Sequence, residues 1–159
     1  QSPNCLFCPL SGSCRALSEG KVQQLPVKQH RTKTTNRYFN YIYVRMGAHT
    51  LIHKRTEDDI WKNLFELPLV ETEKDLSEEE FLACPQFHAL FAEGEVRMVR
   101  TLLRGVKHVL SHRVIYTNFY EVTLPDNSSF FSSYQRVAVE DLGRYAVPRL
   151  IHAFLEKYV

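Results

Sequence analysis

The sequence predicts an α+β fold, with an antiparallel or mixed sheet covered by two helices. Segments rich in aromatic and β-branched residues alternate in polarity with a period of two, as half-buried strands do. Two other segments carry helix-start signals, and the elements follow one another without regular βαβ order. The 159 residues are enough for one domain that buries roughly 70% of its unfolded surface. A hydrophobic core therefore needs neither disulfides nor a second subunit.

The composition excludes several classes of protein. The apolar fraction of 44%, aromatic fraction of 12% and charged fraction of 24% are typical of soluble globular chains. No apolar run approaches the roughly 18 residues that a membrane span requires. Disordered, collagen-like and transmembrane classes are therefore excluded, and no membrane partner is expected.

Two N-terminal segments differ in composition from the rest of the chain. Residues 1–17 contain three cysteines, and their Pro and Gly residues favour turns. Residues 18–36 are polar and basic, with few large apolar side chains, which predicts an extended linker. We expect the globular domain to occupy residues 37–159.

The first strands of this domain are expected at residues 38–45 and 50–54. Aromatic and polar residues alternate along the first segment, and a turn at residues 46–49 makes the pair a predicted β-hairpin. A short strand at residues 64–67 is expected to stop at Pro68. The aromatic side chains at period two are interpreted as core and sheet residues rather than stacking partners for bases.

Local signals predict where the helices begin. Ser77 and Glu80 have the spacing of a capping box, and apolar residues follow it as far as Phe91. Pro85 is expected to break or restart this helix. A closing helix at residues 148–158 has Pro at its first position, where the missing N–H costs nothing.

Three further strands are expected in the second half of the chain. Residues 104–110 and 114–124 are rich in β-branched and aromatic side chains and flank a short turn at residues 111–113, which predicts a second hairpin or a sharp corner. Residues 136–139 are expected to form the last strand, before a helical turn at residues 140–146.

Charge is segregated along the sequence, although the net charge is only +2. Residues 1–55 hold nine basic residues and one acid, and residues 57–80 hold ten acids and two lysines. Residues 97–120 hold five basic residues and no acid. If the basic segments meet on one face, they form a surface that attracts phosphate; the alternative is that both are ordinary solvated faces.

Three of the four cysteines are clustered. Cys5, Cys8 and Cys14 form a C-x2-C-x5-C pattern, which in a reducing compartment indicates metal ligands. Zinc and iron–sulfur sites require four thiolate or imidazole ligands, so one ligand is missing. It could be His30 or a residue outside this chain, which starts without Met and is expected to be a fragment of a longer protein.

The cysteines and four short motifs resemble the MutY family of adenine DNA glycosylases. The cysteines match the last three positions of the family's C-x6-C-x2-C-x5-C pattern. The motifs that follow in the family's order are Leu25-Pro26-Val27-Lys28 in the linker, residues 59–68 (DIWKNLFELP), residues 107–112 (KHVLSH) and Tyr145-Ala146-Val147-Pro148. The resemblance covers nearly the whole chain.

This resemblance implies a Nudix-like (MutT-like) domain at residues 37–159. In the family, this domain recognises 8-oxoguanine opposite a mispaired adenine, and the adenine is removed by a separate N-terminal domain. The expected partner is therefore double-stranded DNA with an 8-oxoguanine:A or G:A mismatch. Repair or replication proteins are further expected partners. The chain is expected to act as a monomer in the bacterial cytoplasm and to lack glycosylase activity by itself.

The resemblance also implies a cofactor. In the family, the cysteines hold a 4Fe–4S cluster, so residues 1–17 are interpreted as the remnant of the cluster loop and residues 18–36 as the linker between domains. Because only Cys5, Cys8 and Cys14 are present, the cluster is expected to be absent or incomplete in this chain.

Lesion recognition is assigned by the resemblance to Leu110, Ser111 and His112. The N7–H of 8-oxoguanine is a donor where guanine has an acceptor, so a serine hydroxyl can accept from it. Leu110 stands where the family usually has Phe, so a stacking role loses aromatic surface. The alternatives are that Ser111 satisfies its own turn backbone and that His112 is an ordinary exposed turn residue.

Contacts to the DNA backbone are expected from Lys28, Arg31, Lys33 and Arg37. They lie in or next to a basic linker that can follow a duplex, and contacts of this kind fix register without reading sequence.

Two other functions are weighed. The first is Nudix-type nucleotide hydrolysis, which needs a Gly-x5-Glu-x7-Arg-Glu-x-x-Glu-Glu motif to gather carboxylates around a metal. That motif is absent, since Leu69-Val70 occupies the place of the glycines and Glu78, Glu79 and Glu80 point to different faces of a helix. The second is a protein-interaction module in which the acidic residues 57–80 bind a repair partner.

Overall fold

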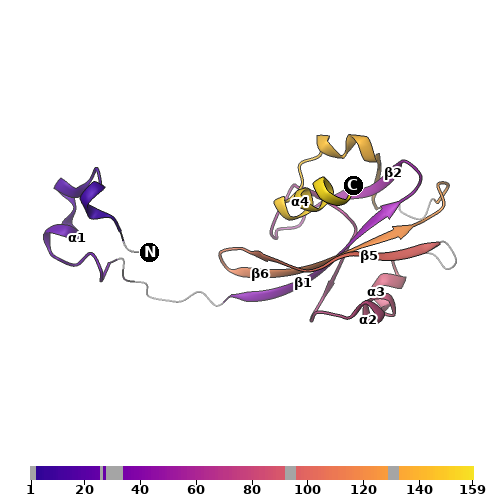
Figure 1. Ribbon diagram of the computed structural model, residues 1–159, viewed down its shortest axis with the longest axis horizontal. Helices are drawn as coiled ribbons and strands as arrows, with labels where there is room; N and C mark the ends of the chain where they lie inside the picture. The colour runs from indigo at the N-terminus through magenta and orange to yellow at the C-terminus, as the bar shows by residue number, and fades with distance from the viewer. Residues whose placement is uncertain (1–2, 26, 28–33, 92–95, 129–132) are drawn as a thin grey trace. The chain divides into compact units, whose positions relative to one another are not determined.

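The computed structural model describes residues 3–25, 27, 34–91, 96–128 and 133–159 (Figure 1). The chain forms two compact units, residues 1–33 and 34–159. The first unit contains two short 3₁₀ turns, η1 (Cys5–Phe7) and η2 (Ser11–Ser13), and one turn of helix, α1 (Arg15–Ser18). None of its described residues is buried, so this unit has no hydrophobic core in the part that the structure describes.

The second unit contains two sheets and belongs to the α+β class, as the sequence predicts. The larger sheet has the order β4-β1-β6-β5, formed by β4 (Leu69–Thr72), β1 (Thr35–Arg45), β6 (Arg113–Thr123) and β5 (Met98–Val109). Strands β1 and β6 are parallel, and the other neighbours are antiparallel. The smaller, antiparallel sheet has the order β3-β2-β7, formed by β3 (Phe65–Glu66), β2 (His49–Lys54) and β7 (Gln135–Ala138).

The hairpin expected from residues 38–45 and 50–54 is only a turn. Met46 and His49 exchange both backbone hydrogen bonds, at 3.0 and 2.9 Å, around Gly47 with its φ of 57°. Beyond this bridge the strands separate, because β1 pairs with β4 and β6 whereas β2 pairs with β3 and β7. Strand β1 is buried on both faces from Phe39 to Val44, so it lies inside a sheet with a neighbour on each edge.

The second predicted hairpin is confirmed. Strands β5 and β6 are antiparallel neighbours, but β5 begins at Met98, six residues before the expected start at residue 104. The register is irregular between Thr101 and Val106, where Gly105 has a φ of 68° and donates its N–H to Asn118 Oδ1 at 2.9 Å. This bulge interrupts the alternation of side chains, which concealed the first half of the strand.

The strand predicted before Pro68 is shorter than expected, and a second strand follows the proline. The strand expected at residues 64–67 is reduced to β3, and the chain resumes after Pro68 as β4, a strand that the sequence did not indicate. Strand β4 is a four-residue edge strand, and its first residues follow directly on a proline.

The helix signals are confirmed with one shift. Ser77 accepts from the N–H of Glu80, whose carboxylate accepts from Ser77 N–H, so α2 (Glu78–Leu82) starts with a full capping box. Pro85 restarts the helix as the first residue of α3 (Pro85–His88). Pro148 is the N-cap of α4 (Arg149–Tyr158) rather than its first residue, and a 3₁₀ helix, η3 (Val139–Arg144), precedes it.

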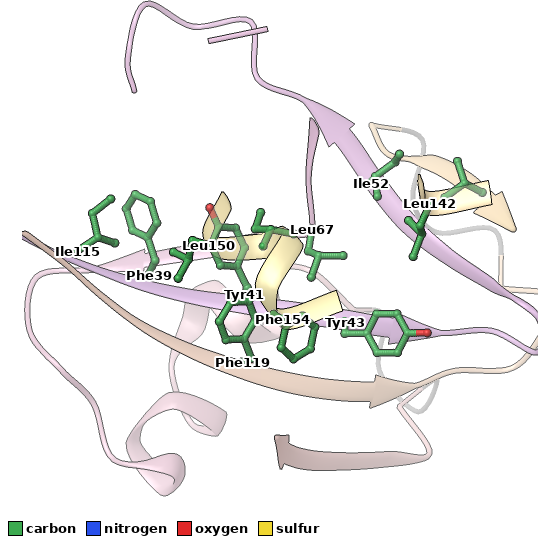
Figure 2. Close-up of a cluster of buried hydrophobic side chains, with 12 residues drawn as sticks. Phe39, Tyr41, Tyr43, Ile52, Leu67, Ile115, Phe119, Leu142, Leu150 and Phe154 are labelled. Carbon is green, nitrogen blue, oxygen red and sulfur yellow. The ribbon is translucent and has the colours of Figure 1, made fainter. Parts of the chain in front are cut away.

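The larger sheet has a hydrophobic cluster on each face. Helix α4 covers one face, where Phe39, Tyr41 and Tyr43 pack with Phe119 and Phe154 (Figure 2). Helices α2 and α3 cover the other face (Figure 1), whose cluster includes Ile42, Val44, Phe81, Phe87 and Tyr120. Alternate residues of β1 thus serve opposite cores, as period-two aromatic residues predict. No helix in the described residues is both long enough and apolar enough to cross a membrane.

We expect Phe154→Ala to destabilise the second unit by about 3–5 kcal/mol, because it removes a buried ring and leaves a cavity. Phe154 is 2% exposed, and its ring stacks on that of Phe119 at a centroid distance of 4.1 Å. Urea unfolding measures the loss. Lys157→Ala in the same helix changes an exposed side chain and should shift stability by less than about 0.5 kcal/mol. Equal losses in both variants would contradict this assignment of the core.

Candidate functional site

Residues 110–113 form the turn between β5 and β6, which we call the tip. The tip presents two polar side chains to solvent. Leu110 N–H donates to Arg113 C=O at 2.8 Å, which closes a turn with Ser111 and His112 at its centre. Both of these side chains are exposed, whereas Leu110 is half-buried and packs against the first hydrophobic cluster. The joined ends of β5 and β6 extend past α4 and α2 (Figure 1). A flat surface or a groove can therefore approach Ser111 and His112 without meeting a helix.

Strand β1 begins beside the tip. Thr35 N–H donates to His112 C=O at 3.2 Å, and Thr35 pairs with Arg113 across the parallel ladder. The chain thus enters the second unit at the tip, two residues before Arg37. The predicted backbone contacts Lys28, Arg31 and Lys33 precede this point in the sequence and lie outside the described residues.

The base of the tip is held by an ion-pair network that is centred on Asp59. This carboxylate accepts hydrogen bonds from Arg37 at 2.6 Å, from Arg55 at 3.0 Å and from Arg113. Arg37 also donates two hydrogen bonds of 2.6 Å to Glu71 and is only 18% exposed. The Arg37 guanidinium therefore donates its hydrogen bonds to Asp59 and Glu71 of its own domain.

The same network continues into the core through Glu66. This side chain is 2% exposed and accepts two hydrogen bonds of 2.8 Å from Arg55 and one of 2.9 Å from the Tyr41 hydroxyl. His53 Nε2 lies 3.2 Å from Glu66 Oε1. Burial raises the pKa of the Tyr41 hydroxyl well above its ordinary value, so it stays protonated and donates to Glu66.

The two central carboxyls are held in their ionised form. Burial by itself would raise the pKa of Asp59, but hydrogen bonds from Arg37 and Arg113 outweigh it and hold the pKa well below its ordinary value. Burial likewise opposes ionisation of Glu66, and hydrogen bonds from His53 and Arg55 lower its pKa nonetheless. Each ion pair is therefore stabilised in the folded state.

The loop that carries Asp59 has an unusual backbone. Trp61 and Asn63 have φ values of 59° and 69°, a left-handed backbone conformation that residues other than glycine rarely adopt. Arg55 closes the loop from both ends, since its N–H donates to Leu64 C=O at 2.9 Å and its C=O accepts from Asn63 N–H at 2.8 Å. The Trp61 ring packs against the rings of Phe39 and His108 rather than facing solvent alone. Residues 55–64, which we call the supporting loop, are therefore closed by backbone hydrogen bonds and packed beneath the tip.

Sequence reasoning missed this network because its members are distant along the chain. Asp59 lies 22 positions from Arg37 and 54 from Arg113. Only the Arg55–Asp59 spacing of four residues is a local signal, and by itself it does not indicate the partners on β1 and β6. As a result, the acidic segment at residues 57–80 is not one continuous acidic surface, since Asp59, Glu66 and Glu71 face arginines inside the domain.

The described residues gather no set of three His, Cys, Asp or Glu side chains that could hold a metal ion. Cys5, Cys8 and Cys14 are half-buried free thiols in the first unit, and they do not converge on one point. As placed, these residues do not fit an iron–sulfur cluster. Glu78, Glu79 and Glu80 form the first turn of α2, where negative charge suits the helix dipole.

A cavity of about 600 Å³ lies at the end of β1 opposite to the tip and is lined by Tyr43, Arg45, Arg100, Glu121 and Tyr158, among others. Glu121 is 3% exposed and faces both arginines, at 3.2 Å from Arg100 and 3.8 Å from Arg45. Both arginines that line the cavity are thus already paired with Glu121. The exposed polar groups of the tip remain the better candidate for a functional site.

A family model described as "NUDIX domain" matches residues 40–157. The adenine DNA glycosylase of Buchnera aphidicola subsp. Acyrthosiphon pisum (strain APS) is 25% identical over 159 residues, which are 98% of this chain and 43% of the relative. The adenine DNA glycosylase of Buchnera aphidicola subsp. Schizaphis graminum (strain Sg) is 31% identical over 72 residues, 45% of this chain and 21% of the relative. The chain thus spans less than half the length of these curated relatives.

Two solved structures share the fold. The C-terminal domain of mouse MUTYH, in a crystal structure of its complex with human PCNA, matches with a TM-score of 0.59 and 15% identity over 77% of this chain and 86% of that one. A Nudix hydrolase from M. smegmatis, RenU, matches with a TM-score of 0.54 and 10% identity over 79% and 83% of the two chains. At these identities the likeness concerns the fold alone.

We expect Asp59→Asn to destabilise the second unit by about 1–3 kcal/mol, because three guanidiniums lose their shared negative partner. Asp58→Asn is a matched control one residue away, since Asp58 is 97% exposed and pairs only with Lys62 in the contacts that the structure gives it. This control should change stability by less than about 0.5 kcal/mol. Urea unfolding at neutral pH compares the two variants, and equal losses would show that the network contributes nothing.

Stability should fall as the pH is lowered. Asp59 and Glu66 have pKa values below their ordinary values of 3.8 and 4.5, so the unfolded chain binds protons that the folded chain does not. Their contribution is complete above those ordinary values and is lost progressively as acid protonates the folded carboxyls. Urea unfolding between pH 7 and pH 3 measures this loss, and the loss should be smaller in Glu66→Gln than in the unsubstituted chain. A flat profile would contradict the assigned direction of both shifts.

Proposed function

The chain belongs to the NUDIX domain family, and from that premise we propose that it is the C-terminal lesion-recognition domain of an adenine DNA glycosylase. It recognises 8-oxoguanine opposite a mispaired adenine, and the adenine is hydrolysed by a domain outside this chain. The similarity to two adenine DNA glycosylases supports the choice of parent enzyme, and the fold of the mouse MUTYH C-terminal domain supports the choice of domain.

The single observation that carries the proposal is the exposed pair Ser111 and His112 on a turn whose base is held by the ion pairs of Asp59. In 8-oxoguanine the N7 position carries a proton, so Ser111 Oγ can accept a hydrogen bond from it, whereas N7 of guanine is itself an acceptor. His112 is adjacent and exposed, which suits contact with a phosphate. Leu110 packs against the core, so its role is to anchor the turn rather than to stack on a base.

The tip can discriminate only if it keeps its position as DNA approaches. The ion pairs of Asp59 with Arg37 and Arg113 fasten β1, β6 and the supporting loop to one another directly below the tip. For this reason we assign Arg37 to the support of the tip. The expected phosphate contacts then fall to Lys28, Arg31 and Lys33.

We propose no catalysis by this chain. Hydrolysis of nucleotides by the fold requires carboxylates gathered around a metal, and among the described residues no such group exists. The glycosylase reaction is assigned to the part of the parent enzyme that this chain does not include. Since Cys5, Cys8 and Cys14 supply three of the four ligands that a 4Fe–4S cluster needs, we propose that the chain by itself holds no complete cluster.

Double-stranded DNA with an 8-oxoguanine:A or G:A mismatch is the proposed partner. We propose a repair or replication protein as a second partner because the mouse MUTYH domain forms a complex with human PCNA. The similarity to bacterial glycosylases supports a place in the bacterial cytoplasm.

The test is a titration of this chain, at one fixed low salt concentration, against duplexes that differ only in an 8-oxoguanine:A, G:A or G:C pair. We expect tightest binding to the 8-oxoguanine duplex. Ser111→Ala should reduce the preference over G:A by about 5- to 150-fold, which corresponds to the roughly 1–3 kcal/mol of one base-edge contact.

Ser133→Ala, an exposed serine before β7, is the control and should leave the preference unchanged. If all three duplexes bind equally, with or without Ser111→Ala, the domain supplies only electrostatic attraction and the proposed lesion recognition is wrong.

A further inference from the structure

One face of the hairpin that carries the tip is not covered by any described helix of the second unit. Tyr38 on β1, Tyr116 on β6 and Lys107 on β5 are register partners, so their side chains lie on the same face of the sheet. Val109, two residues after Lys107, lies on that face as well. We call these four residues the arm face.

The arm face is apolar and basic. The rings of Tyr38 and Tyr116 stack at a centroid distance of 5.5 Å and an interplanar angle of 17°, and both are only half-buried. Lys107 Nζ lies 6.0 Å from the centroid of the Tyr116 ring. Val109 is 65% exposed. An apolar side chain therefore faces water immediately before the tip.

The helices on this side of the sheet lie farther from the tip. Helices α2 and α3 pack over Ile42, Val44 and Tyr120, which follow Tyr38 and Tyr116 along their strands. The ends of β5 and β6 extend beyond α2 in Figure 1. The carboxylate of Asp75 also lies farther along, where it accepts from Asn118 at 3.1 Å. No described contact brings a carboxylate to Lys107.

On the opposite face of the same strands, the charged side chains are paired with one another. It carries Arg37 and Arg113, whose charges are neutralised by Asp59 and Glu71. The supporting loop adds Asp58 and Lys62, which pair with each other at 3.2 Å. A phosphate that approaches the hairpin therefore meets paired charges on this side, whereas on the other side it is attracted to Lys107.

We propose that the arm face is the surface of this domain that contacts the sugar–phosphate backbone of DNA, an inference that rests on the proposed binding of the tip to a base edge. The strands that lead to a tip inserted in a groove must cross the phosphates that line the groove, so one face of the hairpin lies against the backbone. Lys107 pairs with a phosphate, the tyrosine hydroxyls donate to phosphate oxygens, and Val109 packs on deoxyribose. These contacts hold the tip in register and carry no sequence information.

Salt dependence of binding to the same three duplexes tests the proposal. Each phosphate neutralised by a lysine contributes about −0.9 to the slope of log K against log salt concentration. Lys107→Ala should therefore make the slope shallower by about 0.9, and it should weaken binding to all three duplexes by the same factor. Tyr116→Phe, which keeps the ring and removes the hydroxyl, should also weaken all three equally, without a change in slope.

Lys62→Ala is the matched control, since Lys62 is 47% exposed and belongs to the supporting loop on the opposite face. It should leave the slope unchanged, and urea unfolding verifies that each variant is folded. The proposal is overturned if Lys107→Ala leaves the slope unchanged, or if Lys62→Ala is the variant that reduces it.

The two proposals fail in different ways. If the 8-oxoguanine duplex is preferred but Lys107→Ala leaves the slope unchanged, lesion recognition stands and the arm face is wrong. If no duplex is preferred but Lys107→Ala reduces the slope, the arm face stands and lesion recognition by Ser111 is wrong.

Discussion

The position of the tip depends on one carboxylate. Asp59 accepts hydrogen bonds from Arg37 on β1, Arg55 at the start of its own loop, and Arg113 on β6. Removing this charge from water costs free energy, and three guanidiniums offset the cost because the group is partly shielded from solvent and salt. Strands β1 and β6, which carry Arg37 and Arg113, are parallel neighbours, so no turn joins them directly; the carboxylate connects them through side chains instead.

The features predicted from the sequence are those that depend on neighbouring residues. The capping box of Ser77 and Glu80, the restart at Pro85 and the turn at Ser111 and His112 each involve residues only a few positions apart. The parallel pairing of β1 with β6 joins residues 78 positions apart, such as Asn40 and Asn118. A period of two tells which face a side chain occupies but not which strand lies beside it, so the pairing of β1 could not be predicted.

In the candidate site, too, the residues of a local motif were predictable, whereas contacts between distant residues were not. Ser111 and His112 were found because the loop resembles a family motif, and the structure places both in solvent. Charge counts along the chain gave no comparable guide, since the basic Arg37 and Arg113 meet the acidic Asp59 in space. Basic and acidic residues that lie in separate segments of the sequence thus neutralise one another in the folded domain. Lys107 has the same charge as these arginines in the sequence, and only the sheet register separates it from them by placing it on the other face.

This separation of charges also separates affinity from specificity. A phosphate contact strengthens binding to every duplex, whereas a base-edge contact changes the ratio between duplexes. A domain whose guanidiniums were all free beside the tip would bind every duplex more tightly, but the ratio between duplexes would not change. Because Arg37, Arg55 and Arg113 are committed to carboxylates, they add little general attraction beside the tip. The proposed hydroxyl contact of about 1–3 kcal/mol then sets the ratio between duplexes, and the proposed phosphate contact of Lys107 sets the affinity that all of them share.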